Sequence, residues 1–262
     1  MRFALMTLAL LAGCASTPPR QAVTDLAPSG TLRAAINVGN AVLAARPATP
    51  GGEPTGISVD LARELGRRLG VPVQLVVFDA AGKVVDAGRT GGWDIAFVAL
   101  DPKRAAEIAQ SPPYVQIEGS YLVKNDSPLK SNDEVDRKGH RVVVGRNSAY
   151  DLYLTRELKQ AQIVRTPTSG AVVDTMLKEN YEVSAGVKQA LENDARRIPG
   201  VRLLPGRFMV INQAMASQRN KEAGARYVRE FIEEMKASGF VARAIERHQQ
   251  PSAVVAPPGD PK

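Results

Sequence analysis

The feature that most constrains the fold is a regular alternation of short apolar runs and helical patterns that starts at Gly30. Residues 32–38 and 73–78 are rich in β-branched and apolar side chains, as buried parallel strands are. Between them a helical segment begins near Ser58 and ends at Gly70, with leucines four residues apart on one face. Strands that alternate with helices predict an α/β fold built on parallel sheets.

The alternation resumes after the sequence SPPY at residues 111–114. Strands are expected at residues 120–124 and 140–145, a helix is expected to begin near Ser148, and further strands and helices follow. The last stretch, about residues 221–248, is expected to be helical, with apolar residues spaced by four.

The first fourteen residues, MRFALMTLALLAGC, have the pattern of an export signal. A basic start at Arg2 precedes an apolar run of roughly ten residues, which is too short to span a ~30 Å hydrocarbon core as a helix. The sequence LAGC resembles a bacterial lipobox, so we expect residues 1–13 to be a lipoprotein signal peptide and Cys14 to carry the lipid. The alternative is an ordinary signal peptide with an incidental cysteine. Cys14 is the only cysteine, so an intramolecular disulfide is not possible.

Two further terminal segments are rich in Pro and small or polar residues. We expect residues 14–29 to form a flexible tether and residues 249–262 to form a disordered tail.

The formal net charge of the chain is +7, and Lys and Arg are interleaved with acidic residues rather than gathered in blocks. Together with the export signal, this pattern favours a solvated basic surface near a membrane and argues against a nucleic-acid partner. Phosphate-binding loops, dinucleotide-binding fingerprints and serine-hydrolase elbows are absent from the sequence. His140 and His248 lie far apart and have no companion cysteines. We therefore expect no cofactor and no metal.

One arginine lies in an unusual place. Asp101 reads as an N-cap and Pro102 as the first residue of a short helix, which puts Arg104 in the first turn. A cation at this positive end of the helix dipole typically loses a few tenths to ~1 kcal/mol relative to an acidic residue. The helix position alone does not explain why Arg104, a cation, lies where the backbone already attracts anions.

Four segments in the expected order resemble family 3 of the extracytoplasmic solute-binding proteins, the amino-acid-binding components of ABC importers. They are GTLRAAINVG, EPTGISVDLARELGRRLGVPVQLV, GGWDIAFVALDPKRAAEIAQSPPY and SNDEVDRKGHRVVVGRNSAYDLYL. The resemblance implies the two-lobed periplasmic binding protein fold of type II, with two parallel-sheet lobes that close over a solute. The implied lobe 1 is 30–114 and 213–248, lobe 2 is 119–207, and the two hinge strands lie about 114–118 and 209–213.

The resemblance also implies a site. Arg104 takes the position of the family arginine that pairs with the ligand carboxylate, and Ser148 or Asn147 would donate to the same group from a second helix N-terminus. Alternatively, Arg104 packs over its helix or pairs with Glu107, and Ser148 is a plain N-cap. Both Ser148 roles are compatible.

Three positions depart from the family pattern. Val187 falls where an Asp commonly pairs with the α-ammonium, Ala99 replaces a Ser or Thr, and Asn40 is the main polar group where an aromatic residue commonly stacks. An unpaired buried ammonium costs several kcal/mol. We therefore expect a carboxylate-bearing solute that lacks the usual amine.

These observations predict a periplasmic, lipid-anchored and monomeric binding protein that is not an enzyme and that passes a small solute to an ABC permease in the inner membrane. The alternative is an exported enzyme on the same fold, such as a cyclohexadienyl (prephenate/arogenate) dehydratase-like lyase. Such an enzyme needs a general acid or base in the cleft, for which Glu118 and Glu53 are the candidates. A sensory ectodomain would need a transmembrane helix, which the sequence does not encode.

Overall fold

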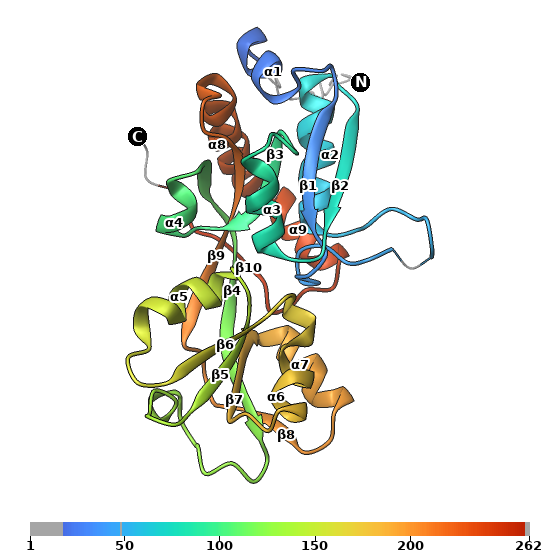
Figure 1. Cartoon of the computed structure of the whole chain (residues 1–262). Helices are drawn as coiled ribbons and strands as arrows, with labels where there is room; N and C mark the ends of the chain where they lie inside the picture. The colour runs from blue at the N-terminus through green and yellow to red at the C-terminus, as the bar shows by residue number, and fades with distance from the viewer. Residues whose placement is uncertain (1–17, 48, 260–262) are drawn as a thin grey trace, which may run out of the picture.

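The structure, a computed structural model, describes residues 18–47 and 49–259. Two α/β lobes lie one above the other and are joined by two long strands, β4 (Ile108–Lys124) and β9 (Met209–Gln218) (Figure 1). The expected two-lobed α/β fold is confirmed. Residues 1–17, which include the lipobox and Cys14, lie outside the described residues. None of the described helices is both long and apolar enough to span a bilayer.

The strands form one mixed sheet in the order β2-β1-β3-β9-β4-β7-β5-β6. In each lobe three strands pair in parallel, as the alternating sequence pattern predicts. The joining strands differ, because β9 runs antiparallel to β3 and β4 runs antiparallel to both β9 and β7. The lobe sheets are therefore not purely parallel. Besides β4 and β9, the strands are β1 (Leu32–Asn37), β2 (Val73–Phe78), β3 (Ile95–Ala99), β5 (Arg141–Gly145), β6 (Gln162–Thr166), β7 (Val183–Val187), β8 (Val201–Leu203) and β10 (Val254–Val255).

Helices cover both faces of the sheet. In lobe 1, helix α2 buries the leucine face that the sequence predicts, and Gly70 ends it with a left-handed φ of 69°. The stretch expected to be helical, residues 221–248, holds two helices, α8 and α9, which Gly239 separates with a φ of 75°. The helices are α1 (Arg20–Leu26), α2 (Ile57–Leu69), α3 (Ala81–Gly88), α4 (Pro102–Ala105), α5 (Ala149–Glu157), α6 (Val172–Lys178), α7 (Lys188–Arg197), α8 (Glu222–Ala237) and α9 (Phe240–Arg247), with 3-10 turns η1 (Asn132–Glu134) and η2 (Ser169–Ala171).

The segment expected to be a flexible tether contains a packed helix. In α1, Ala22 and Leu26 are fully buried, and the Asp25 carboxylate accepts a hydrogen bond of 3.1 Å from the backbone N–H of Gly224 at the start of α8. Gly224 lets the two helices approach closely, since a Cβ there would lie 2.9 Å from a methyl group of Leu26. The tether prediction is therefore wrong for residues 20–26, because the Pro-rich composition hid a short run with an apolar face.

The expected disordered tail is ordered in part. Strand β10 pairs antiparallel with Val115 and Gln116 of β4, and the neighbouring Ala253 and Ala256 are buried. Ser252 also donates a hydrogen bond of 2.8 Å to Gln189 on α7 of lobe 2. The prediction of disorder is wrong for this part of the tail, because a two-residue strand that pairs with an existing edge leaves almost no periodic signal.

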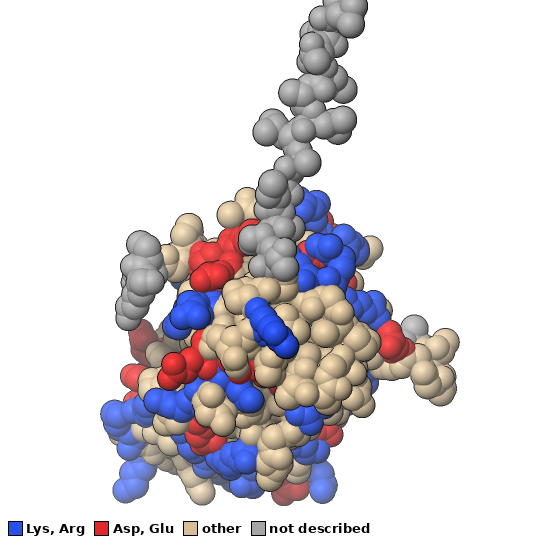
Figure 2. All heavy atoms as spheres, turned by 90° about the horizontal axis from the view of Figure 1, so that it is seen from above, with Lys and Arg blue, Asp and Glu red and all other residues tan. Residues whose placement is uncertain are grey.

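The surface carries mixed charges. On the face shown in Figure 2, basic and acidic side chains are intermingled. This distribution matches the interleaving that the sequence shows.

Candidate functional site

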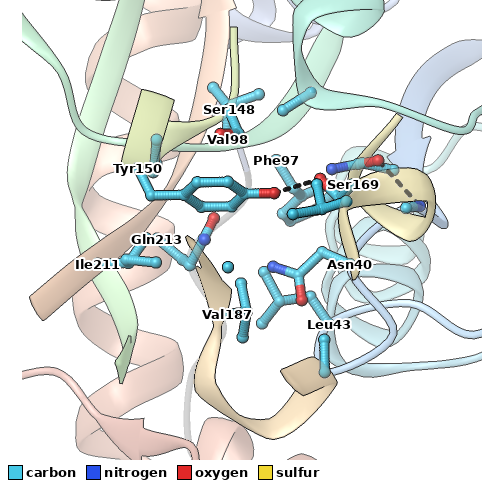
Figure 3. Close-up of a pocket in the computed structure, with 18 of the residues that line it drawn as sticks. Asn40, Leu43, Phe97, Val98, Ser148, Tyr150, Ser169, Val187, Ile211 and Gln213 are labelled. Atoms are coloured by element: carbon cyan, nitrogen blue, oxygen red, sulfur yellow. Dashed lines mark hydrogen bonds between the residues drawn. The ribbon is translucent and has the colours of Figure 1, made fainter. Parts of the chain in front are cut away.

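A cavity of about 60 Å³ lies between the lobes, beside the point where β9 passes from one lobe to the other (Figure 3). Its walls combine polar groups with a predominantly apolar surface. The lining residues are Asn37, Gly39, Asn40, Leu43, Ser58, Ala81, Phe97, Val98, Ala99 and Arg104 from lobe 1, Ser148, Ala149, Tyr150, Ser169, Val172, Ala185, Gly186, Val187, Ala190, Leu191 and Asp194 from lobe 2, and Ile211 and Gln213 from β9.

Arg104 lies in this lining with only 2% of its surface exposed. Its Nη1 donates to the backbone carbonyl of Ala99 at 3.0 Å, and its Nη2 donates across the cleft to the backbone carbonyl of Asn147 at 2.8 Å. Burial lowers the pKa of Arg104 to about 10, while the nearby Asp101 opposes this shift. The guanidinium therefore remains charged at neutral pH.

No carboxylate among the described residues forms an ion pair with Arg104. Glu107, its alternative partner, is bound instead by Arg89 at 2.7 Å. Asp101 forms an ion pair of 2.9 Å with Arg156 on α5 of the other lobe. The cleft thus holds a buried cation whose contacts within the protein are backbone carbonyls.

The local fold explains why Arg104 lies at this point. Strand β3 ends at Ala99, and Asp101 caps the short helix α4 by accepting a hydrogen bond of 2.9 Å from the backbone N–H of Lys103. This cap holds the first turn of α4 against the cleft, where Arg104 is buried. A helix-stabilising acidic residue at this position would put a negative charge into the cavity wall instead.

On lobe 2, the N-terminus of α5 contributes to the wall. Ser148 is its N-cap, and its Oγ accepts a hydrogen bond of 3.0 Å from the backbone N–H of Asp151. The backbone N–H groups of Ala149 and Tyr150 have no acceptor among the described residues. Asn147 does not line the cavity itself but takes a left-handed φ of 55° and offers its carbonyl to Arg104. The N-cap role of Ser148 and its place in the lining hold together.

Two hydroxyl pairs that the sequence reasoning missed contribute Tyr150, Ser169 and Ser58 to the polar lining. The Tyr150 hydroxyl donates to Ser169 Oγ at 2.8 Å (Figure 3), and burial raises the pKa of Tyr150. Ser58 and the buried Tyr114 share a hydrogen bond of 3.1 Å. No sequence motif marks these residues, because their contact depends on how elements distant in the sequence pack together.

The positions that depart from the family pattern also line the cavity. Ala99 presents its carbonyl to Arg104, and Val187 is the N-cap of α7 without a side-chain cap bond. The carboxylate in the lining is Asp194, one residue that the sequence reasoning missed, and it forms an ion pair of 2.9 Å with Arg197. Asn40 and Gln213, the second of which was also missed, place amide groups in the lining.

The two glutamates considered as catalytic groups do not line the cavity. Glu118 is held by Lys188 at 2.8 Å and by Arg207 at 2.7 Å, and these hydrogen bonds lower its pKa. The side chain of Glu53 is 70% exposed and pairs with Arg63.

Comparison with solved structures shows extensive similarity of fold. A solute receptor for L-cysteine from Neisseria gonorrhoeae aligns with a TM-score of 0.75 at 19% identity, covering 88% of this chain and 94% of the receptor. A mutant of the ArgBP protein from T. maritima aligns with a TM-score of 0.73 at 18% identity, covering 87% of this chain and 99% of ArgBP.

An ancestral amino-acid-binding protein, AncCDT-1, described as a precursor of cyclohexadienyl dehydratase, aligns with a TM-score of 0.72 at 20% identity, covering 86% of this chain and 98% of AncCDT-1. No curated protein sequence matches the chain.

The sequence model of one family, the bacterial extracellular solute-binding proteins of family 3, matches residues 40–251. That match includes β3, α4, the N-terminus of α5 and both joining strands, and so covers nearly all of the cavity lining. The chain therefore belongs to the bacterial extracellular solute-binding proteins, family 3.

Proposed function

We propose that this chain captures a small carboxylate-bearing solute in the cavity between its lobes and delivers it to an ABC permease in the inner membrane. The observation that carries the proposal is Arg104, a buried cation in the cavity wall without a carboxylate partner among the described residues. A buried charge without a counterion is costly, so an anionic solute would stabilise the closed state.

The geometry of Arg104 suits a carboxylate. Its two hydrogen bonds to backbone carbonyls use two of the five guanidinium N–H groups and leave the others for a ligand. The backbone N–H groups of Ala149 and Tyr150 offer further donors at the N-terminus of α5. A carboxylate between these donors would contact both lobes at once and so favour closure.

The opposite wall supports a solute without an α-ammonium group. Val187 provides no charge, and the carboxylate of Asp194 is already paired with Arg197. The structural neighbours include a protein bound to L-arginine and a solute receptor for L-cysteine. Their low sequence identity leaves room for a different solute here.

The test is a thermal-shift screen of the full chain against small carboxylates, amino acids and neutral analogues. A ligand at a hundred times its dissociation constant adds about 2.7 kcal/mol to the free energy of unfolding. For a chain of this size this corresponds to a rise in Tm of roughly 5–10 °C. Binding of neutral analogues alone, with no carboxylate active, would refute the proposal.

The enzymatic alternative has one supporting observation, the similarity in fold to AncCDT-1. Against it, Glu118 and Glu53 both lie outside the cavity lining. Mass spectrometry of each hit after prolonged incubation separates the two functions, because a binding protein returns the solute unchanged and a lyase consumes it.

The lipid anchor is a separate part of the proposal and rests on the LAGC sequence that ends at Cys14. We expect Cys14→Ser to move the protein from the membrane fraction to the soluble fraction of its native cell envelope. Finding the variant still bound to membrane would mean that another segment anchors it.

A further inference from the structure

We infer that the solute is a small monocarboxylate with a neutral hydroxyl in place of the α-ammonium, and that Asn40 and Gln213 bind this hydroxyl. This inference rests on the proposed function and specifies the chemical class of its solute. The inference comes from asking which polar groups of the cavity already have partners within the protein.

Most polar side chains of the lining are engaged. The hydroxyls are bonded to one another or to backbone, both charged groups have partners, and Asn37 Oδ1 accepts from the backbone N–H of Gly39 at 3.0 Å. The engaged groups are Ser58 with Tyr114, Ser148 with the backbone of Asp151, Ser169 with Tyr150, Arg104 with two carbonyls and Asp194 with Arg197.

Two amide side chains are the exception. The Oδ1 atom of Asn40 is shielded from solvent and has no hydrogen-bond donor among the described residues. Gln213 is 5% exposed, its side chain forms no hydrogen bond with any described residue, and its amide lies in the cavity lining, although unlike Asn40 Oδ1 it is not fully shielded from solvent. In Figure 3 the two amides extend toward the cavity from opposite sides, with Val187 near them. Arg104 and the backbone N–H groups at the start of α5 are assigned to the carboxylate, so these two amides are the side-chain groups left for the rest of the solute.

The chemistry of the amides selects the solute group. An amide oxygen accepts and an amide nitrogen donates, whereas an ammonium group only donates. A hydroxyl can do both, so it can accept from one amide and donate to the other. Neither amide supplies the negative charge that a desolvated ammonium requires. The lining therefore favours a 2-hydroxy acid over the α-amino acid of the same carbon skeleton.

The rest of the cavity limits the size of the solute. Leu43, Phe97, Leu191 and Ile211 form much of the apolar wall, and the volume of about 60 Å³ fits a short side chain. A second charged group would have to be buried against these side chains without a free counterion. The solute class is accordingly a short-chain hydroxy monocarboxylate.

The experiment compares trios of acids that differ only at the second carbon, using calorimetry on the full chain. One trio is lactate, alanine and propionate, and a second is 2-hydroxy-3-methylbutanoate, valine and 3-methylbutanoate, with both enantiomers of each chiral acid. We expect the hydroxy acid to bind about tenfold or more tightly than the other two members, as a gained buried hydrogen bond and an uncompensated ammonium imply.

Two substitutions test whether Asn40 and Gln213 bind the hydroxyl group. Asn40→Leu keeps a similar side-chain volume, and we expect it to reduce the preference for the hydroxy acid over the unsubstituted acid to about threefold or less, while the unsubstituted acid binds as before. Gln213→Leu is the second variant, in case the first does not fold. Asn125→Leu, an exposed position outside the cavity, is the matched control and should keep the full preference.

The outcomes separate the two proposals. If no carboxylate binds, the proposed function fails and this inference fails with it. If carboxylates bind and the amino acid or the unsubstituted acid of a trio binds as tightly as the hydroxy acid, the proposed function stands and the inference is wrong. A hydroxy-acid preference that survives in both Asn40→Leu and Gln213→Leu would also overturn the assignment of these residues.

Discussion

Replacing Arg104 by alanine tests the centre of the site. The substitution removes the charged group that a carboxylate would contact and the hydrogen bond that crosses the cleft to the carbonyl of Asn147. Truncating one partner of a buried charge pair typically costs about 2–5 kcal/mol, which corresponds to roughly 30-fold to several thousandfold in Kd. Because the interlobe bond is lost as well, we expect a loss of about a hundredfold or more.

The fold should tolerate the change. The Ala99 carbonyl keeps a partner in the variant, because the Gln110 side-chain amide also donates to it at 3.0 Å. Losing its bond to Ala99 should lower the free energy of unfolding by about 1 kcal/mol, or Tm by roughly 2–4 °C. Arg104→Lys, which keeps the charge but not the planar fork, should recover only part of the affinity.

The assay is titration calorimetry with the tightest carboxylate from the thermal-shift screen. Arg229→Ala, which removes an exposed arginine of α8, is the matched control and should bind normally. A Kd for Arg104→Ala within about threefold of wild type, with the fold intact, would refute the assignment of Arg104 as the carboxylate partner.

Three further predictions concern closure, selectivity and pH. Arg156→Ala breaks the ion pair with Asp101 across the cleft. We therefore expect small-angle scattering to show a more open average shape and calorimetry to show a several-fold weaker solute affinity. Unchanged scattering would mean that this pair does not hold the lobes together. Val187→Asp supplies a carboxylate to the cavity and a side-chain N-cap to α7. We therefore expect α-amino acids to begin to bind and Tm to rise by a few degrees. If calorimetry detects no amino-acid binding to this variant, position 187 does not determine selectivity against the ammonium group. The hydrogen bond from Arg68 lowers the pKa of Glu234 below its ordinary value of 4.5, so this pair stabilises the native state above that pH and the contribution is lost as the pH falls through the lowered value. Because Glu234 is half exposed, the effect should be below about 1 kcal/mol, and urea midpoints at pH 6 and pH 3 should differ less in Arg68→Ala than in wild type.

The sequence predicts the two α/β lobes because the local strand and helix patterns agree with the lobe architecture. Strand–helix alternation predicts the parallel strands of each lobe. Arg104 stands out in the sequence because a cation at the N-terminus of a helix is unfavourable, and it lies in the cavity wall. The antiparallel course of β4 and β9 was not predictable, because strand direction across a lobe boundary leaves no trace in periodicity. Neither α1 nor β10 was expected, since both are short and depend on packing against distant segments.

Several residues of the site could not be predicted from the sequence, for the same physical reason. Gln213 reads as an ordinary residue of an apolar run, and only the crossing of β9 behind the cavity gives it a functional position. The contact of Tyr150 with Ser169 and the contact of Arg104 with the carbonyl of Asn147 join segments far apart in the chain. Partner choice between such groups is decided by three-dimensional packing, which one sequence does not encode in any local pattern.

The N-terminal helix gives the two lobes unequal mechanical roles. Because α1 is bonded to α8 through Asp25 and Gly224, the N-terminal helix is attached to lobe 1. If Cys14 carries the proposed lipid, lobe 1 is the anchored lobe and lobe 2 moves relative to it when the cleft closes. Six peptide bonds separate Cys14 from Arg20, a reach of at most about 20 Å. With the proposed anchor, this short reach would hold lobe 1 near the membrane surface.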